Sequence, residues 1–230
     1  MPEAWPVLLV IPVAVIDWIA VAARRHRLEL LFKPLTMLVL IWAVLLSRPL
    51  AADSRQALWF LIGFVFSLGG DVFLMFAPED RNGSGRSRFP FFQAGLGSFL
   101  MAHLAFIVGL SPALPPAPSL LTLVIILPVG AALLRRLLRT LRRSSEPSLM
   151  LPIALYSLVL TLMFFAAVAT LFRSDWDPRR AAFAAAGGLL FFLSDSLLGW
   201  NRFVRPLPHG SVLVHVSYHG AQLLLAGSLL

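Results

Sequence analysis

Two acidic residues lie inside segments that are otherwise apolar enough to cross a membrane. Asp71 lies in SLGGDVFLMF and Asp195 lies in LLFFLSDSLLGW. Burying a carboxylate in hydrocarbon costs about 2.5–3.5 kcal/mol on insertion scales, so such residues serve a function or bond to a neighbouring helix. When two carboxylates are held close together in a low dielectric, one can stay protonated while the other is ionised. We therefore hypothesise that Asp71 and Asp195 form an acid–base pair that needs no metal.

Further polar residues in the apolar segments are candidates for binding a substrate beside the two carboxylates. They are Lys33, His103, Asn201, His215, Tyr218 and Gln222. His215 and Tyr218 are three positions apart and would share a helix face. For each candidate the alternative is a structural hydrogen bond between helices, and Asp17 could be the partner of a basic group. Ser194 is a weak nucleophile candidate, because adjacent residues such as Ser194 and Asp195 point in different directions on a helix.

Zinc is the alternative to a metal-free acid–base pair. Its ligands would be Asp71, Asp195, His103 and His215, each on a different helix. However, the sequence contains no H-E-x-x-H motif, no Gly-rich phosphate loop and no G-x-S-x-G elbow. It also contains no cysteine, which excludes disulfides, thiolate ligands and a cysteine nucleophile. We therefore expect no cofactor, with zinc as the alternative.

The composition indicates that these residues lie in a membrane. Of the 230 residues, 59% are hydrophobic and 13% are charged, whereas soluble domains are about 45–50% apolar and about 25% charged. The net charge of +8 does not indicate nucleic-acid binding, because the basic residues flank apolar runs without aromatic interleaving. We expect one membrane domain over residues 1–230, with the apolar N-terminal segment as an uncleaved first span.

The hydrophobic pattern predicts an all-α bundle of eight transmembrane helices. Apolar runs of about 17–24 residues recur along the chain, close to the ~20 residues that cross a bilayer. The runs are Trp5–Ala23, Leu30–Leu46, Ala57–Phe76, Phe92–Leu110, Ser119–Leu138, Leu149–Phe172, Ala181–Gly199 and Ser211–Leu229. Short connections favour antiparallel packing of neighbouring helices. Gly95, Gly97 and the Gly187–Gly188 pair are expected to let helices approach closely.

The basic residues predict the orientation of this bundle. Most of the 19 lysines and arginines lie in the connections after the first, third, fifth and seventh runs. Because cytoplasmic loops carry an excess of Lys and Arg, these connections should face the cytoplasm and both termini should lie outside. The segment Leu133–Arg143 alternates leucine and arginine pairs, as expected of a helix end anchored at the inner membrane surface.

With this orientation the polar candidates fall at similar depths. At a rise of about 1.5 Å per residue, Asp71 and Asp195 lie one to two turns from the cytoplasmic ends of their helices. The candidates of the last run, His215, Tyr218 and Gln222, fall in its inner half, and the outer half of the bundle is almost purely apolar. The sequence therefore predicts a polar cavity that opens towards the cytoplasm or the inner leaflet.

Five segments together resemble the YhhN-like lysoplasmalogenases, membrane enzymes that include the mammalian transmembrane lysoplasmalogenases. The segments are KPLTML at Lys33–Leu38, SLGGDVFLM at Ser67–Met75, FQAGLGSFLMAHLAFI at Phe92–Ile107, GGLLFFLSDSLLGWNRF at Gly187–Phe203 and VSYHGAQLLLAG at Val216–Gly227. They occur in order from the second run to the last and are specific as a set. Two positions depart from the pattern, since His219 replaces an expected aromatic residue and Ala105–Phe106 lacks an expected tyrosine.

The resemblance implies hydrolysis of the vinyl ether bond of lysoplasmalogens. The products would be a fatty aldehyde and glycerophosphoethanolamine or glycerophosphocholine. The resemblance assigns the catalytic pair to Asp71 and Asp195, and it places Lys33, His103, Tyr218 and Gln222 in the site. The reaction begins with protonation of the β-carbon and continues with water addition, steps that paired carboxylates can serve. Which aspartate is the acid stays open, and Lys33 is the candidate for binding the lipid phosphate.

Other functions also stay open at this point. One is a metal-dependent, ceramidase-like lipid hydrolase that uses the same residues. Another is a proton-coupled carrier, because buried carboxylates and histidines serve proton relays, although the sequence shows no internal repeat or interrupted helix pair. We expect a lysophospholipid substrate, contact with membrane lipids, no nucleic acid, and a location in the inner (plasma) membrane. The headgroup preference and the formation of a homodimer are not decided by the sequence.

Overall fold

The computed structural model describes residues 5–47, 54–77, 90–111, 114–144 and 147–230, and within these ranges it is helical with no strand. The helices in chain order are α1 (Trp5–Leu8), α2 (Val10–Ala22), α3 (His26–Leu46), α4 (Ser54–Met75), α5 (Phe91–Leu110), η2 (Ala117–Thr122), α6 (Leu123–Leu141), η3 (Pro147–Leu149), α7 (Met150–Ala169), η4 (Thr170–Phe172), α8 (Pro178–Phe203) and α9 (Gly210–Gly227). Each of the predicted apolar runs therefore coincides with helix.

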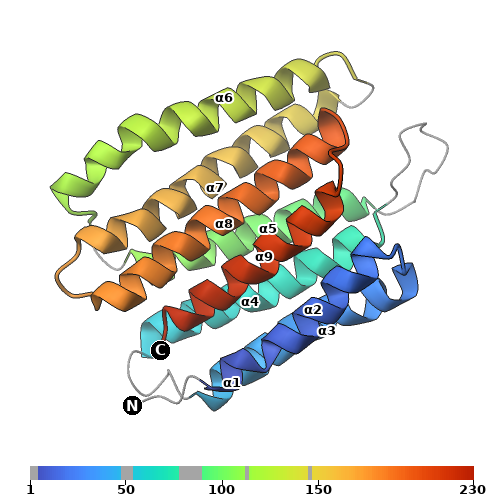
Figure 1. Cartoon of the computed structure of the whole chain (residues 1–230). Coiled ribbons are helices and arrows are strands. Elements are labelled where there is room, and N and C mark those ends of the chain that lie inside the picture. Colours follow the sequence, from blue (N-terminus) through green and yellow to red (C-terminus); the bar gives the residue numbers. More distant parts are fainter. Residues whose placement is uncertain (1–4, 48–53, 78–89, 112–113, 145–146) are drawn as a thin grey trace.

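The helices lie side by side in one bundle (Figure 1). The closest partners are α4 with α5, α8 with α9, and α2 with α3, while α6 lies at one edge and packs on α7. A cluster of buried aromatic side chains, including Phe60, Phe64, Phe106 and Phe191, fills the space between α4, α5 and α8. This packing holds α4, α5, α8 and α9, which carry all of the predicted site residues except Lys33, in fixed relative positions.

Six helical segments, from α3 to α8, are long and apolar enough to cross a membrane, and Pro6–Ala22 is a shorter apolar helix. Large apolar side chains point outward from the bundle. Leu121, Val124 and Ile125 are 75%, 73% and 71% exposed. Apolar surface of this extent suits contact with lipid and not with water. The protein is therefore a multi-pass helical membrane protein.

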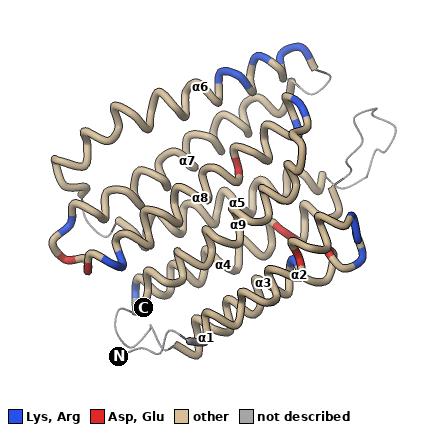
Figure 2. The backbone as a smooth tube through the Cα atoms, in the orientation of Figure 1, with Lys and Arg blue, Asp and Glu red and all other residues tan. Residues whose placement is uncertain are grey.

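Most of the described basic residues lie at one end of the bundle, and a smaller number lie at the other end (Figure 2). The α2–α3 and α8–α9 connections lie at the same end as the C-terminal end of α6 (Figure 1), and Figure 2 shows Lys and Arg at each of them. The start of α1 and the end of α9 lie at the opposite end (Figure 1). A further predicted basic connection, residues 81–88, lies outside the described residues. This excess of Lys and Arg at one end is the pattern from which the orientation was predicted.

Glycines allow close packing at three of the four predicted positions. A Cβ atom on Gly188 would lie 2.5 Å from Cβ of Ala167, and a Cβ on Gly187 would lie 3.0 Å from Leu225. At Gly95 a Cβ would lie 2.8 Å from the side chain of Leu74. The prediction is wrong for Gly97, because a Cβ there meets nothing within 4 Å. Gly97 points away from the neighbouring helices, although it is only two residues from Gly95.

Candidate active site

Asp195 lies on α8 in a small hydrogen-bonded cluster with one residue from α5 and one from α7. Its Oδ2 lies 3.0 Å from Nε2 of His103 and accepts a hydrogen bond from the hydroxyl of Tyr156. The same imidazole nitrogen lies 3.1 Å from the Tyr156 hydroxyl. All hydrogen bonds that the described residues make to Asp195 end on Oδ2. One carboxylate oxygen is thus held in place by two neighbours, and Oδ1 remains for a ligand.

A cavity of about 50 Å³ adjoins this cluster. Most of its wall consists of apolar side chains from α5, α6, α7 and α8, whereas Asp195, Tyr156 and Arg202 contribute polar groups. Ligand sites have this character, with apolar walls and a few polar groups that fix orientation. Asp195 lines the cavity although its side chain is only 7% exposed. A molecule in the cavity would therefore meet a carboxyl group in a largely apolar environment.

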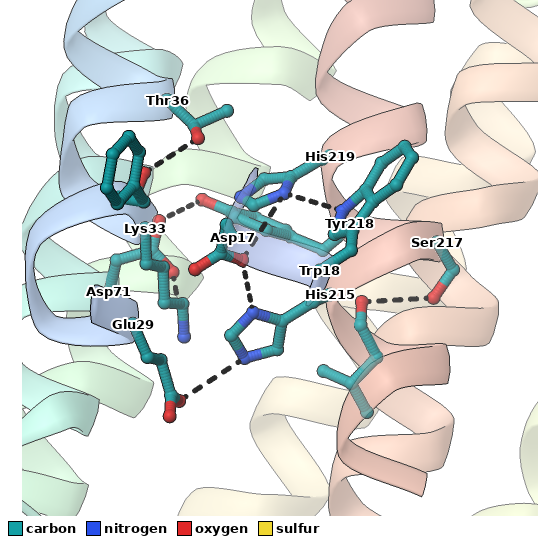
Figure 3. Close-up of polar contacts among 12 residues, drawn as sticks. Asp17, Trp18, Glu29, Lys33, Thr36, Asp71, His215, Ser217, Tyr218 and His219 are labelled. Carbon is teal, nitrogen blue, oxygen red and sulfur yellow. Dashed lines mark hydrogen bonds and ion pairs between the residues drawn. The ribbon is translucent and has the colours of Figure 1, made fainter. Parts of the chain in front are cut away.

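Asp71 lies on α4, is 1% exposed, and has both oxygens engaged (Figure 3). Nζ of Lys33 lies 3.3 Å from Oδ1, and the hydroxyl of Tyr218 donates to Oδ2 at 2.6 Å. Lys33 is not at the start of its helix, because α3 begins at His26 and not at Leu30. The lysine therefore lies about two turns inside the helix, at the level of the carboxylate that it neutralises.

A second set of charged groups surrounds His215, next to the Asp71 site (Figure 3). His215 Nδ1 lies 2.6 Å from Asp17 Oδ2, and its Nε2 lies 3.7 Å from Glu29 Oε1. Nε1 of Trp18 donates to Nδ1 of His219 at 3.0 Å. The structure thus gives Asp17 the basic partner that was considered for it. His215 contacts two carboxylates, and a role for it in substrate binding stays a prediction.

Aromatic rings lie between the Asp71 and Asp195 clusters. The ring of Phe191 packs against His103 and Tyr218, with centroid distances of 4.7 and 5.6 Å. Phe99 packs edge-on against Tyr218 at 5.7 Å. No hydrogen bond or ion pair between described residues joins Asp71 to Asp195. The two aspartates therefore belong to neighbouring networks that meet through the ring of Tyr218.

Three other candidates from the sequence have structural partners or lie outside the cavity. Asn201 accepts a hydrogen bond from the backbone N–H of Leu207 at 3.0 Å and so fixes the α8–α9 connection. The hydroxyl of Ser194 donates to the carbonyl of Val214 at 3.1 Å, which ties α8 to α9. Gln222 is buried on α9, about one turn beyond the tyrosine that bonds Asp71. Roles for Asn201 and Gln222 in substrate binding stay predictions.

Tyr156 is the site residue that the sequence reasoning missed. It is one of two tyrosines in the chain, and each of them donates a hydrogen bond to one of the two aspartates. Tyrosine is amphipathic and common in membrane helices, so its type alone gives little reason to select it. Two features of the sequence could have identified Tyr156: tyrosine is scarce in this chain, and Tyr156 lies in the middle of an apolar run.

The four zinc candidates separate into two groups, His103 with Asp195 and His215 near Asp71. Among the residues that the structure describes, no group of three or more His, Cys, Asp or Glu side chains is arranged to hold a metal ion. Structural and catalytic zinc sites require at least three protein ligands. The described residues therefore do not supply the ligand set that the zinc alternative requires.

The fold and these buried clusters define a multi-pass membrane protein with acid–base groups at the side of an apolar cavity. The chain belongs to the YhhN family, which it matches over residues 28–229. This confirms the resemblance seen in the five sequence segments. No solved structure matches the chain.

The curated relatives include proteins named lysoplasmalogenase from mammals and bacteria. The chain is 36% identical to human lysoplasmalogenase TMEM86B over 141 residues, which cover 60% of this chain and 54% of the human protein. It is 30% identical to the mouse TMEM86B over 221 residues, or 95% of this chain and 78% of that protein. With the lysoplasmalogenase of Mycobacterium tuberculosis it shares 27% identity over 191 residues, 83% of this chain and 66% of that protein. The matches to the human and pig proteins span about half of their length.

Proposed function

We propose that this protein is a lysoplasmalogenase that hydrolyses the vinyl ether bond of lysoplasmenylethanolamine or lysoplasmenylcholine. The products are a fatty aldehyde and glycerophosphoethanolamine or glycerophosphocholine. The observation that carries this proposal is the position of Asp195, which lines an apolar cavity with Oδ2 bonded to His103 and Tyr156 and Oδ1 left for a ligand. The names of the relatives supply the substrate class.

In the first step Asp195 acts as the general acid. The carboxyl proton passes from Oδ1 to the β-carbon of the vinyl ether, and the carbon–carbon double bond supplies the electron pair. The product is an oxocarbenium ion, in which the positive charge is shared between the α-carbon and the ether oxygen. General acid catalysis of this type contributes about 10²–10⁴ in rate. His103 and Tyr156 position the carboxyl group by holding its other oxygen.

In the second step water adds to the oxocarbenium carbon. The carboxylate of Asp195 accepts a proton from this water, as the acid residue of a retaining glycosidase does in its second step. As the hemiacetal breaks its bond to the glycerol oxygen, its hydroxyl group gives up its proton and becomes the aldehyde carbonyl, and that proton goes to the glycerol oxygen, which leaves as the alcohol. The former alkenyl chain of the lipid leaves as the fatty aldehyde, and Asp195, protonated again, is ready for the next turnover. No step in this sequence requires a metal or another cofactor.

In this proposal Asp71 acts indirectly, through its hydrogen bond with Tyr218. The hydrogen bond from Tyr218 to Asp71 and the ion pair with Lys33 fix the ring of Tyr218 against Phe191. Phe191 in turn packs against His103, the residue that bonds Asp195, so this network helps to hold the Asp195 cluster in place. Asp71 is thus a positioning residue, and Asp195 is the residue that transfers protons.

For topology we propose eight crossings, with both termini outside and the site in the cytoplasmic half of the plasma membrane. Six crossings follow from the length and composition of the helices. The remaining two crossings are α2 and α9. The support for them is that their buried polar residues pair with each other. Asp17 on α2 and His215 on α9 bond to each other inside the bundle. A helix that buries a charged group in this way is stable in a membrane only when packed against its neighbours.

The test is release of fatty aldehyde from lysoplasmenylethanolamine by the purified, detergent-solubilised protein. The control substrate is the saturated alkyl ether of the same headgroup and chain, which has no double bond to protonate. We expect aldehyde from the vinyl ether alone, at an equal rate with and without EDTA. Absence of aldehyde from folded protein would contradict the proposal. Activity that EDTA abolishes would instead favour the metal-dependent hydrolase.

A further inference from the structure

The C-terminal part of α6 carries arginines on one face, and Figure 2 shows Lys and Arg along this end of the helix. Arg135 and Arg139 are four residues apart, and Arg142, the C-cap, follows three residues later with helical backbone angles. Residues at this spacing share one face of a helix. The exposed arginines here, which we call the arginine face, are Arg135, Arg136, Arg139, Arg142 and Arg143.

The arginine face continues the surface that α6 turns towards lipid. Val124, Pro128 and Ala132 are exposed, and they lead to Arg135 in steps of three or four residues, so they lie on the same side of the helix. The outward surface of α6 is therefore apolar along most of the helix and basic at its end. Such a change marks the level in a membrane at which hydrocarbon gives way to headgroups.

The opposite side of the same helical turns packs on the bundle. Leu137 and Leu141 are buried in a cluster with Ile153 of α7, and Leu137 also lines the cavity beside Asp195. Of the six membrane-length helical segments, the one that contains α6 is the least buried. The arginines thus point away from the bundle at its edge, where lipid is the neighbour of α6.

The described residues do not balance the charge of the arginine face. No ion pair between them includes an arginine of this face. Arg136 lies over an aromatic ring, with its guanidinium carbon 5.9 Å from the centroid of Trp200. The helix dipole attracts cations only within the last turn, whereas Arg135 lies more than one turn before the end of α6 at Leu141. Stabilisation of the helix end therefore does not account for the whole face.

We propose that the arginine face of α6 binds the headgroups of anionic phospholipids, with their chains along the apolar part of the same surface. Arginines near an anionic membrane surface attract its lipids, and a guanidinium binds two phosphate oxygens at once. A zwitterionic headgroup adds a cation that the arginines repel, so a net negative headgroup is favoured. The bound lipids lie on the outer side of the helix whose inner side forms a wall of the cavity. This inference does not depend on the proposed function.

The test uses the absence of cysteine from the chain, because one introduced cysteine then carries a fluorophore at a single site. Ala132→Cys puts the fluorophore on the lipid-facing side of α6, about one turn from Arg135. Val65→Cys, at a position on α4 that is 55% exposed, is the control site. The labelled proteins are placed in vesicles of phosphatidylcholine and phosphatidylglycerol, in which one lipid or the other carries bromine and quenches the fluorophore on contact.

At position 132 we expect phosphatidylglycerol to be preferred about fivefold over phosphatidylcholine, the usual gain from one arginine near an anionic surface. At position 65 the two lipids should quench equally, because no arginine lies near it on the outward face of α4. The preference at position 132 should fall in high salt, since the arginines are exposed and their attraction is screened. Equal quenching by the two lipids at position 132 would overturn the proposal.

Arg135→Gln with Arg139→Gln should abolish the preference at position 132. Arg25→Gln with Arg27→Gln is the matched control, because it removes the same charge from the same end of the bundle, next to α2 and α3 at the opposite edge from α6 (Figure 1). This pair should leave the preference unchanged. An equal loss in both pairs would contradict a site on α6 and indicate a general effect of surface charge.

Arg135→Lys with Arg139→Lys keeps the charge and should retain most of the preference, which separates loss of charge from loss of fold. Unchanged quenching at position 65 in each variant checks that the bundle is intact. A lysine pair that lost as much preference as the glutamine pair would contradict a site that depends on charge. No substrate or turnover is involved, so failure of aldehyde release leaves these outcomes readable.

Discussion

The imidazole Nε2 of His103 lies 3.0 Å from Oδ2 of Asp195, across the space between α5 and α8. Tyr156 approaches the same oxygen from α7. Side chains from two other helices therefore hold one carboxylate oxygen, and the carboxyl group cannot rotate freely about its bond to Cβ. The free oxygen is fixed in direction as a result, which is what a proton-transfer group needs.

The hydroxyl of Tyr156 should matter for rate more than for binding. Tyr156→Phe removes one hydrogen bond to Asp195 and keeps the ring in the cavity wall. We expect kcat to fall about tenfold to a hundredfold with little change in KM, because the lost bond is to a carboxyl group that becomes charged as it gives up its proton. Tyr218→Phe is the matched control and should lose less, since its partner Asp71 lies outside the cavity. An equal loss in both variants would contradict the separate roles given to the two aspartates.

The ion pair of Lys33 and Asp71 should show strong coupling in stability. Lys33→Met leaves a buried carboxylate without its cation, which costs about 3–5 kcal/mol in comparable pairs. Removing both charges together, in Lys33→Met with Asp71→Leu, should cost clearly less than the sum of the single changes. The measurement is the free energy of unfolding in mixed micelles for all four proteins of the cycle. Additive losses would show that the two groups do not interact.

Two glycine-to-alanine changes should act in opposite directions. At Gly188 a new Cβ would lie 2.5 Å from Ala167, so α7 and α8 must move apart at a cost of about 1–3 kcal/mol. At Gly97 nothing lies within 4 Å, so alanine should be neutral or should stabilise the helix by up to about 1 kcal/mol. Thermal unfolding of both variants in one detergent checks the difference. A loss at Gly97 as large as that at Gly188 would contradict the packing.

Acid should weaken the connection between η4 and α8 slightly. Arg173 bonds to Asp175 at 3.0 and 2.5 Å and holds the pKa of that carboxyl below its usual value of 3.8. A lowered pKa adds stability above the ordinary value, and this stability is lost as the pH falls through the folded pKa. Because the Asp175 side chain is 63% exposed, the contribution is at most about 1 kcal/mol. Asp175→Ala should thus lower Tm a little at neutral pH, with no difference from wild type in strong acid.

The sequence alone was sufficient to predict the helices and to identify two aspartates that the structure places inside the bundle. Apolar runs of membrane length are a strong signal, and Asp71 and Asp195 are conspicuous because a charge inside such a run is costly. The boundaries shifted by a few residues, and the start of α3 at His26 and not at Leu30 places Lys33 about two turns inside its helix. Helix ends depend on caps and packing that an apolar run does not record.

Which helices contact each other could not be predicted in the same way. Short connections indicate that neighbours in sequence pack together, but Tyr156 and His103 reach Asp195 from helices that are not adjacent to each other in the chain. The aromatic layer formed by Phe99, Phe191 and Tyr218 also depends on this arrangement. It separates two carboxylates whose similar depths had suggested one shared site. The depth of a residue in the membrane can be predicted from the sequence and the orientation of its helix. The position of that helix around the bundle cannot be predicted in this way.

The central claim is that Asp195 transfers the proton to the vinyl ether. Its most direct test is kcat for aldehyde release by Asp195→Asn at saturating lysoplasmenylethanolamine, with thermal unfolding recorded to show that the variant is folded. Asparagine keeps the size and the hydrogen bonds of the side chain and removes the acid. The account predicts a fall in kcat of about 10²–10⁴, the range of general acid catalysis. A folded variant that retained more than about a tenth of the wild-type kcat, a loss well below that range, would contradict it.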